Sequence, residues 1–116
     1  MNGILSIAAS GLRAQLTRLQ SSSHNVANLL TDDFRPQRVD LQARPGGGVQ
    51  ATVSPSEQRG FPRYDMDTGE LLGEYSGTDL AQEALTQITA SRSYEANLAV
   101  IRSEKDRLDT LLDVRT

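Results

Sequence analysis

The C-terminal third of the chain, residues 78–116, contains neither glycine nor proline, and this run constrains the fold more than any other feature. Glycine and proline are the residues that most destabilise a helix interior, so the run predicts one long helix. Near the other end, residues 4–30 carry an apolar row in alternating steps of four and three. That spacing is typical of a helix packed along a partner helix. The sequence therefore predicts two long helices around a middle that holds the prolines.

The apolar rows define the faces on which these helices are expected to pack. The N-terminal row is Leu5, Ala9, Leu12, Leu16, Leu19, Ser23, Val26 and Leu30. The C-terminal row is Leu80, Ala84, Gln87, Ser91, Tyr94, Leu98, Ile101, Lys105, Leu108 and Leu112. Other apolar residues lie off both rows: Ile4, Ile7, Leu29, Leu85, Ile88 and Leu111. Each helix thus has more apolar surface than one antiparallel partner can cover, which predicts contacts with other chains.

The two helices differ in intrinsic stability. Gly11 costs about 1 kcal/mol relative to alanine in a helix interior, and Ser21–Ser23 is a poor helix-forming run, so the first helix needs packing to persist. The last helix opens at Thr78 or Asp79, whose short side chains can accept hydrogen bonds from its free amides. Gln82 follows Asp79 at capping-box spacing.

The middle of the chain has a different period. Residues 39–43 and 49–53 alternate apolar with polar side chains and flank a turn at residues 45–48, which predicts a β-hairpin. Residues 54–77 are expected to be extended or irregular chain, with a tight turn at residues 67–69.

The predicted fold is mainly α with a small β part. Long N- and C-terminal helices pack as an antiparallel or coiled-coil pair, with a short central β-hairpin and an extended loop. Residues 1–34 form the N-terminal segment, 35–77 the central insert and 78–116 the C-terminal helix. The two terminal segments together are expected to form one helical domain.

The composition excludes several classes of function. The chain has 12 basic and 15 acidic residues interspersed along its length, so no basic patch predicts binding to nucleic acid. The absence of cysteine excludes disulfides and thiolate metal sites, and a single histidine excludes most zinc sites. No basic cluster precedes the first apolar residues, and no run approaches the roughly 20 apolar residues of a membrane span. Neither a cleaved secretory signal nor a membrane span is expected.

The candidate chemical sites each have a simpler interpretation. The carboxylates of Asp65, Asp67 and Glu70 are spaced to approach a calcium ion, but the later bidentate glutamate of a calcium loop is absent, so a turn is expected. His24 has no nucleophile motif to serve and is expected at a surface or interface. Tyr94 is expected to be a packing residue with a solvated hydroxyl. We therefore predict no catalytic, metal-binding or cofactor-binding residues.

Two segments resemble a known family. Residues 6–34, SIAASGLRAQLTRLQSSSHNVANLLTDDF, are similar without gaps to the N-terminal signature of bacterial flagellar rod and hook proteins. Residues 79–112, DLAQEALTQITASRSYEANLAVIRSEKDRLDTLL, resemble the C-terminal signature of the same family. The short insert and residues 90–97 are most similar to the short proximal rod proteins, C type. Among the differences, Asp33 stands where a glycine commonly precedes Phe34.

The resemblance implies a structural subunit of the basal-body rod, the axial drive shaft of flagellar motility. Its implied partners are copies of itself, other flagellar axial proteins and the flagellar type III export apparatus, and its implied location is the rod that crosses the periplasm. The terminal helices would form the assembly interface, with the residues Leu5, Leu12, Leu16, Leu19, Asn25, Val26, Asn28, Tyr94, Asn97, Leu98, Ile101, Leu108 and Leu112.

The helix pattern also permits another class of function. A soluble helical adaptor, or an export-linked regulator related to the rod proteins, would use the same helix faces to bind a single partner. A helical array of copies would distinguish a rod subunit from an adaptor, because non-closing contacts between copies generate filaments.

Overall fold

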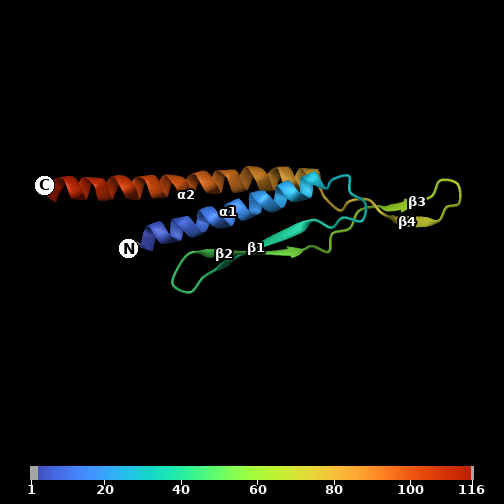
Figure 1. Ribbon diagram of the computed structural model, residues 1–116, viewed down its shortest axis with the longest axis horizontal. Helices are drawn as coiled ribbons and strands as arrows, with labels where there is room; N and C mark the ends of the chain where they lie inside the picture. Colours follow the sequence, from blue (N-terminus) through green and yellow to red (C-terminus); the bar gives the residue numbers. More distant parts are fainter. Residues whose placement is uncertain (1–2, 116) are drawn as a thin grey trace.

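Two antiparallel helices dominate the structure, which is a computed structural model that describes residues 3–115 (Figure 1). Helix α1 is Gly3–Ala27 and helix α2 is Leu80–Arg115. The predicted mainly-α fold, with paired terminal helices and a small β part, is confirmed. Residues 1, 2 and 116 of the predicted segments lie outside the described residues.

Helix α1 forms the middle layer of the molecule (Figure 1). It packs against α2 on one side and against a hairpin of two strands, β1 (Gln37–Ala43) and β2 (Val49–Pro55), on the other. A second hairpin, of strands β3 (Pro62–Tyr64) and β4 (Leu71–Glu74), projects beyond the helices and packs on no other described element. The result is an elongated body of 82 × 25 × 14 Å.

The first hairpin matches its prediction closely. Strands β1 and β2 are antiparallel, and their register pairs the alternating apolar residues directly: Val39 with Val53, Leu41 with Ala51, and Ala43 with Val49. The glycines of the turn all have positive φ, and the hairpin is attached to α1 because Val49 N donates to Ser10 Oγ at 3.1 Å.

Helix α1 ends three residues before the predicted Leu30. The Asn28 amide group closes the helix by donating to His24 O at 2.9 Å, and Thr31 Oγ1 donates to Asn28 Oδ1 at 3.0 Å. The rings of His24 and Phe34 then meet edge to face, with their centroids 5.5 Å apart. Asn28 thus ends the helix, because its side chain hydrogen-bonds to nearby backbone in place of continued helical pairing.

Asp33 adopts a positive φ in the turn after α1. Its φ is 61°, a left-handed conformation that aspartate tolerates better than most residues. Its backbone N donates to Glu74 O at 2.8 Å, and its carboxylate accepts a hydrogen bond from Glu74 N at 2.9 Å. The aspartate therefore both makes the turn and ties it to β4.

The start of α2 was predicted correctly. Asp79 lies just before Leu80, and its carboxylate oxygen accepts hydrogen bonds from Ala81 N at 3.1 Å and Gln82 N at 3.3 Å. These contacts satisfy two of the amides that a helix leaves unpaired at its N-terminus.

The β3–β4 hairpin was not predicted, because residues 54–77 were expected to be extended or irregular. Its strands are short and contain a bulge between Arg63 and Tyr64. The predicted turn is present: Asp65 Oδ1 accepts hydrogen bonds from Asp67 N at 2.8 Å and Thr68 N at 3.3 Å. The Asp65 carboxylate therefore organises a turn, which is the role expected for these acidic residues from the sequence.

The buried face of α1 differs from the predicted leucine row. The buried residues are small or polar: Ala8, Ser10, Gly11, Ala14, Gln15, Ser21, Ser22 and Asn25. At roughly 100° per residue, the leucine row lies to one side of this face. Leu5, Leu12, Leu19 and Val26 are consequently half-buried, Leu16 is 45% exposed, and Leu30 is 92% exposed. Small side chains were selected for this face because α1 must approach two layers at once.

In α2 the predicted row is half correct. The buried residues Glu83, Ala90 and Glu104, together with half-buried Asn97, recur every seven positions and stand one residue before the predicted Ala84, Ser91, Lys105 and Leu98. Five members of the row are half-buried: Gln87, Tyr94, Leu98, Ile101 and Leu108. Leu80 and Leu112 are 53% and 61% exposed, contrary to the prediction. The face of α2 that contacts α1 is narrower than the predicted row because the opposing face of α1 is made mostly of small residues.

Candidate assembly surface

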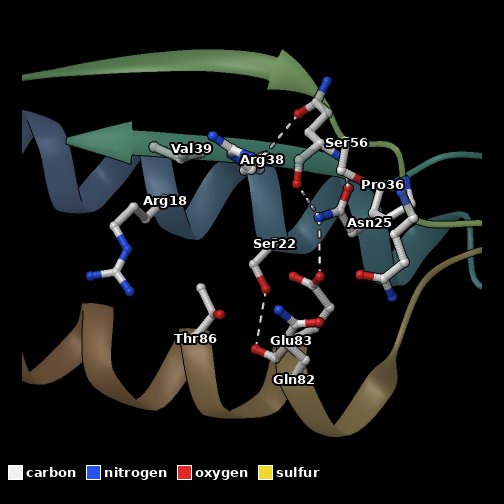
Figure 2. Close-up of a pocket in the computed structure, with 13 residues that line it drawn as sticks. Arg18, Ser22, Asn25, Pro36, Arg38, Val39, Ser56, Gln82, Glu83 and Thr86 are labelled. Carbon is white, nitrogen blue, oxygen red and sulfur yellow. Dashed lines mark hydrogen bonds between the residues drawn. The ribbon is translucent and has the colours of Figure 1, made fainter.

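Asn25 joins three elements at one point. Its side-chain amide pairs with the backbone of Gln37 at the start of β1: Oδ1 accepts from Gln37 N at 2.7 Å and Nδ2 donates to Gln37 O at 3.0 Å. Nδ2 also donates to Glu83 Oε2 on α2 at 3.2 Å (Figure 2). Asn25 is only 2% exposed, so these bonds are shielded from water. The residue fixes the first helix, the first strand and the second helix relative to one another.

Further polar contacts surround this point. Ser22 Oγ donates to the backbone oxygen of Glu83 at 3.2 Å (Figure 2). It also accepts a hydrogen bond from Gln87 Nε2 at 3.2 Å. Thr78 Oγ1 donates to Asn25 O at 3.0 Å, which connects the chain before α2 to the end of α1. A cleft of about 210 Å³ opens beside these residues, with Arg18 and Arg38 at its walls. The residues that line this cleft include no nucleophile in contact with a general base.

A close approach of the helices occurs farther along the pair. A Cβ atom placed on Gly11 would lie 2.6 Å from Oδ1 of Asn97, so only glycine fits beside the asparagine in its present position. Asn97 Nδ2 donates to Ser93 O at 2.9 Å, which holds the side chain against α2. Gly11, which weakens α1 as an isolated helix, therefore leaves the space that the Asn97 side chain occupies.

Helix α2 extends past the start of α1. Ser22 pairs with Glu83, and Gly11 lies against Asn97, so the two helices are antiparallel. In this register α1 reaches its N-terminal end while α2 continues toward its C-terminus (Figure 1). Near this point Arg107 donates to the buried Glu104, and this hydrogen bond together with the carboxylate charge raises the pKa of Arg107 above its ordinary value. The last turns of α2 have no partner helix within the described residues.

The thirteen residues predicted as an assembly interface are not brought together as one surface. Asn25 is buried inside the molecule. Leu16 and Leu112 are 45% and 61% exposed. The other ten are half-buried along the helix pair: Leu5, Leu12, Leu19, Val26, Asn28, Tyr94, Asn97, Leu98, Ile101 and Leu108.

Large apolar side chains remain exposed on several sides of the molecule. Ile4 and Ile7 on α1 are about half exposed, as are Leu80, Leu85, Ile88, Leu111 and Leu112 on α2. The second hairpin and its flanks expose Phe61, Tyr64, Met66, Leu71, Leu72 and Tyr75. Sequence reasoning missed this last group, although aromatic and leucine residues between turn residues 60 and 77 were the available signal. Exposed apolar surface on this scale marks contacts between proteins.

Other kinds of site are not apparent in residues 3–115. No three metal-ligating side chains come together there, and neither helix has a stretch long and apolar enough to cross a membrane. The main feature of the structure is a helix pair that is joined by polar side chains and has apolar residues on its outer faces.

Comparison with known proteins agrees with this geometry. Residues 70–114 match the family described as Flagellar basal body rod FlgEFG protein C-terminal. The flagellar basal-body rod protein FlgC of Yersinia enterocolitica is 32% identical, with 88% of each chain aligned. The protein of the same name from Salmonella typhimurium is 30% identical, with 90% of each chain aligned, and that from Borreliella burgdorferi is 28% identical over 95% of this chain and 94% of its own. With relatives that match nearly end to end and a paired terminal-helix architecture, this chain belongs to the flagellar basal-body rod protein family.

Proposed function

We propose that the chain is a structural subunit of the bacterial flagellar basal-body rod, which assembles through its terminal helices into the axial drive shaft. The observation that carries the proposal is the exposed apolar surface on a helix pair whose own packing is already satisfied by small and polar residues. Leu80, Leu85 and Ile88 on α2 are more than half exposed, although the opposite face of the same turns packs on α1. A helix with apolar residues on both sides needs a second partner.

The proposed partners are copies of the chain and other axial proteins of the flagellum. In this proposal, residues 1–34 and 78–116 act as one axial helical unit, and residues 35–77 form an insert on it. The subunit leaves the cell through the flagellar type III export apparatus without a cleaved signal peptide and takes its place in the rod where it crosses the periplasm. Its role is mechanical: it transmits torque through packing and has no catalytic step.

The proposed interface uses the helix faces in two ways. Asn25, Asn28 and Asn97 make their hydrogen bonds within the chain, and that of Asn25 to Glu83 joins α1 to α2. The exposed parts of the leucine and isoleucine side chains make the contacts between subunits. The two roles are complementary, because a rigid pair presents its outer faces in one fixed geometry.

The direct test is location. The chain is expressed with an epitope tag inserted after Glu57, in the exposed chain between β2 and β3, in a flagellated strain that lacks its own proximal rod gene. Basal bodies are then purified, and their rods are imaged after labelling with antibody. The proposal expects restored swimming and label on the rod.

The control is the same strain with the tagged chain carrying Gly11→Leu, which leaves no space for Asn97 and prevents the helix pair from forming. This variant should give neither swimming nor label. Restored swimming with the tagged chain only in the cytoplasm would contradict the proposal and would instead fit an adaptor that acts on export.

A further inference from the structure

The β3–β4 hairpin presents an apolar and acidic surface to solvent. Tyr64 is 56% exposed, Leu71 is 60% exposed, and Met66 in the connecting turn is 98% exposed. The hairpin packs on no other helix or strand among the described residues, although the loop residues Asp33 and Arg35 lie beside Tyr64 and Leu71. Exposed apolar side chains on a projecting hairpin mark a contact with another protein.

The charges on this hairpin identify the kind of partner. Arg63 and Glu74 are already paired, with Asp32 and Arg59. The carboxylate of Asp65 is occupied by the turn amides. Asp67 and Glu70 remain exposed, and no ion pair within the described residues involves them. The hairpin tip therefore offers two uncompensated negative charges beside apolar side chains.

The opposite charge pattern occurs in the groove between α1 and β2. Helix α1 has no acidic residue, and Arg13 on its surface has no carboxylate partner in residues 3–115. Arg44, directly after β1, lines the same groove of about 200 Å³, and no ion pair within residues 3–115 involves it.

We propose that the β3–β4 hairpin of one subunit docks into the α1–β2 groove of a second copy of the same chain. Asp67 and Glu70 pair with Arg13 and Arg44 of the second copy, while Met66 and its apolar neighbours cover the exposed side of α1. Charge complementarity of this kind steers association and fixes register.

The contact is directional, because hairpin and groove are different surfaces of one molecule. They lie in different parts of the elongated body, with the second hairpin at one end of the long axis (Figure 1). A subunit that inserts its hairpin into a neighbour leaves its own groove free for the next. Heterologous contacts that do not close generate a filament, so the inferred contact extends the proposed rod function and rests on it.

Disulfide trapping tests the contact, since the chain has no cysteine to interfere. A variant with both Asp67→Cys and Arg44→Cys is expressed in the strain that lacks its own proximal rod gene, and purified basal bodies are mildly oxidised. The inference expects a ladder of disulfide-linked dimers and higher multimers. Each single-cysteine variant should give none. The matched control, Asp67→Cys with Arg92→Cys, replaces an exposed arginine on α2 and should also give none.

Charge reversal is the second measurement. Arg13→Glu with Arg44→Glu, or Asp67→Arg with Glu70→Arg, should each lower incorporation into basal bodies by roughly tenfold, because like charges then face each other. Combining the four changes should restore incorporation. The control Arg35→Glu with Arg38→Glu changes the net charge by the same amount as the first pair, at exposed positions outside both the groove and the helix faces, and should have little effect.

The outcomes separate this contact from the function on which it rests. If the unmodified chain is present in basal bodies but the double-cysteine variant forms no ladder, or links to a different protein, the contact between copies is wrong and the rod function stands. If the unmodified chain is absent from basal bodies, the rod function is wrong and the contact falls with it.

Discussion

At the scale of single residues, the helix pair is held by polar and small side chains rather than by leucines. Asn25 supplies both halves of a backbone-like pair to Gln37 and a further hydrogen bond to Glu83. Gly11 permits Asn97 to lie against α1. These contacts depend on geometry more than on buried area, so conservative substitutions at these positions are expected to have large effects.

The first prediction compares two asparagines. Asn25→Ala leaves the Gln37 amide and the Glu83 carboxylate buried without this partner, and we expect a loss of about 2–4 kcal/mol in the free energy of unfolding. Asn28→Ala removes exposed hydrogen bonds and should cost about 1 kcal/mol or less. Urea unfolding followed by circular dichroism measures both. Equal losses in the two variants would mean that Asn25 does not carry this role.

The second prediction is a coupling between Gly11 and Asn97. Gly11→Ala alone should destabilise the chain by about 1–3 kcal/mol, because the new methyl group meets Asn97. In a background of Asn97→Ala the same change should be neutral, or stabilising by up to about 1 kcal/mol through helix propensity. A double-mutant cycle on unfolding free energies measures the coupling. If Gly11→Ala costs the same in both backgrounds, the close approach does not constrain position 11.

At the scale of elements, the sequence was most informative where the signals are local. The glycine-free run, the Asp79 cap and the alternating strands at residues 39–43 and 49–53 predicted α2 and the first hairpin, because each depends on neighbouring residues. The second hairpin depends on contacts distant in sequence, such as that of Asp33 with Glu74, and its strands are too short to show a period.

The buried face of α1 was harder to predict for a different reason. Reasoning from hydrophobicity selects the largest apolar residues as the packed row, but α1 lies between two layers and uses its smallest residues there. The leucines are left for the margins of the intramolecular contact and for the outer surface. The thirteen-residue interface predicted from sequence therefore mixes residues that shape the subunit with residues that are open to a neighbour.

The third prediction concerns the stability of α1 as an element. In the dilute isolated chain, the amides of residues 4–30 should exchange with solvent faster than those of residues 80–104, because Gly11 and the serine run weaken the helix and its outer apolar face is uncovered. Hydrogen exchange with mass spectrometry, with residues 80–104 of α2 as the internal comparison, measures this. Strong protection across α1 in the dilute chain would show that the helix needs no neighbour.

At the scale of the whole molecule, the structure is an elongated two-helix body with a hairpin along one side and another at one end (Figure 1). Its interior contacts are specific but small in area, since the buried apolar side chains among the described residues are small: Ala8, Ala14, Ala90 and Pro36. Most large apolar residues are at least partly exposed. A chain of this shape gains most of its burial on assembly, which is the property expected of a filament subunit.

The central claim is that the outer helix faces become buried between subunits. Its most direct test is Leu85→Asp, at a side chain 62% exposed in the single chain, with Gln82→Asp as a matched control at an exposed polar position in the same helix. The free energy of unfolding of both variants should lie within about 0.5 kcal/mol of that of the unmodified chain, because neither side chain is in the interior.

The measurement is incorporation of each variant into purified basal bodies. Burial of the new carboxylate between subunits should cost about 3 kcal/mol or more per contact, so Leu85→Asp should be nearly absent from the rod while Gln82→Asp is incorporated normally. Leu85→Asp incorporated as fully as the unmodified chain would contradict the claim that this helix face joins the subunits.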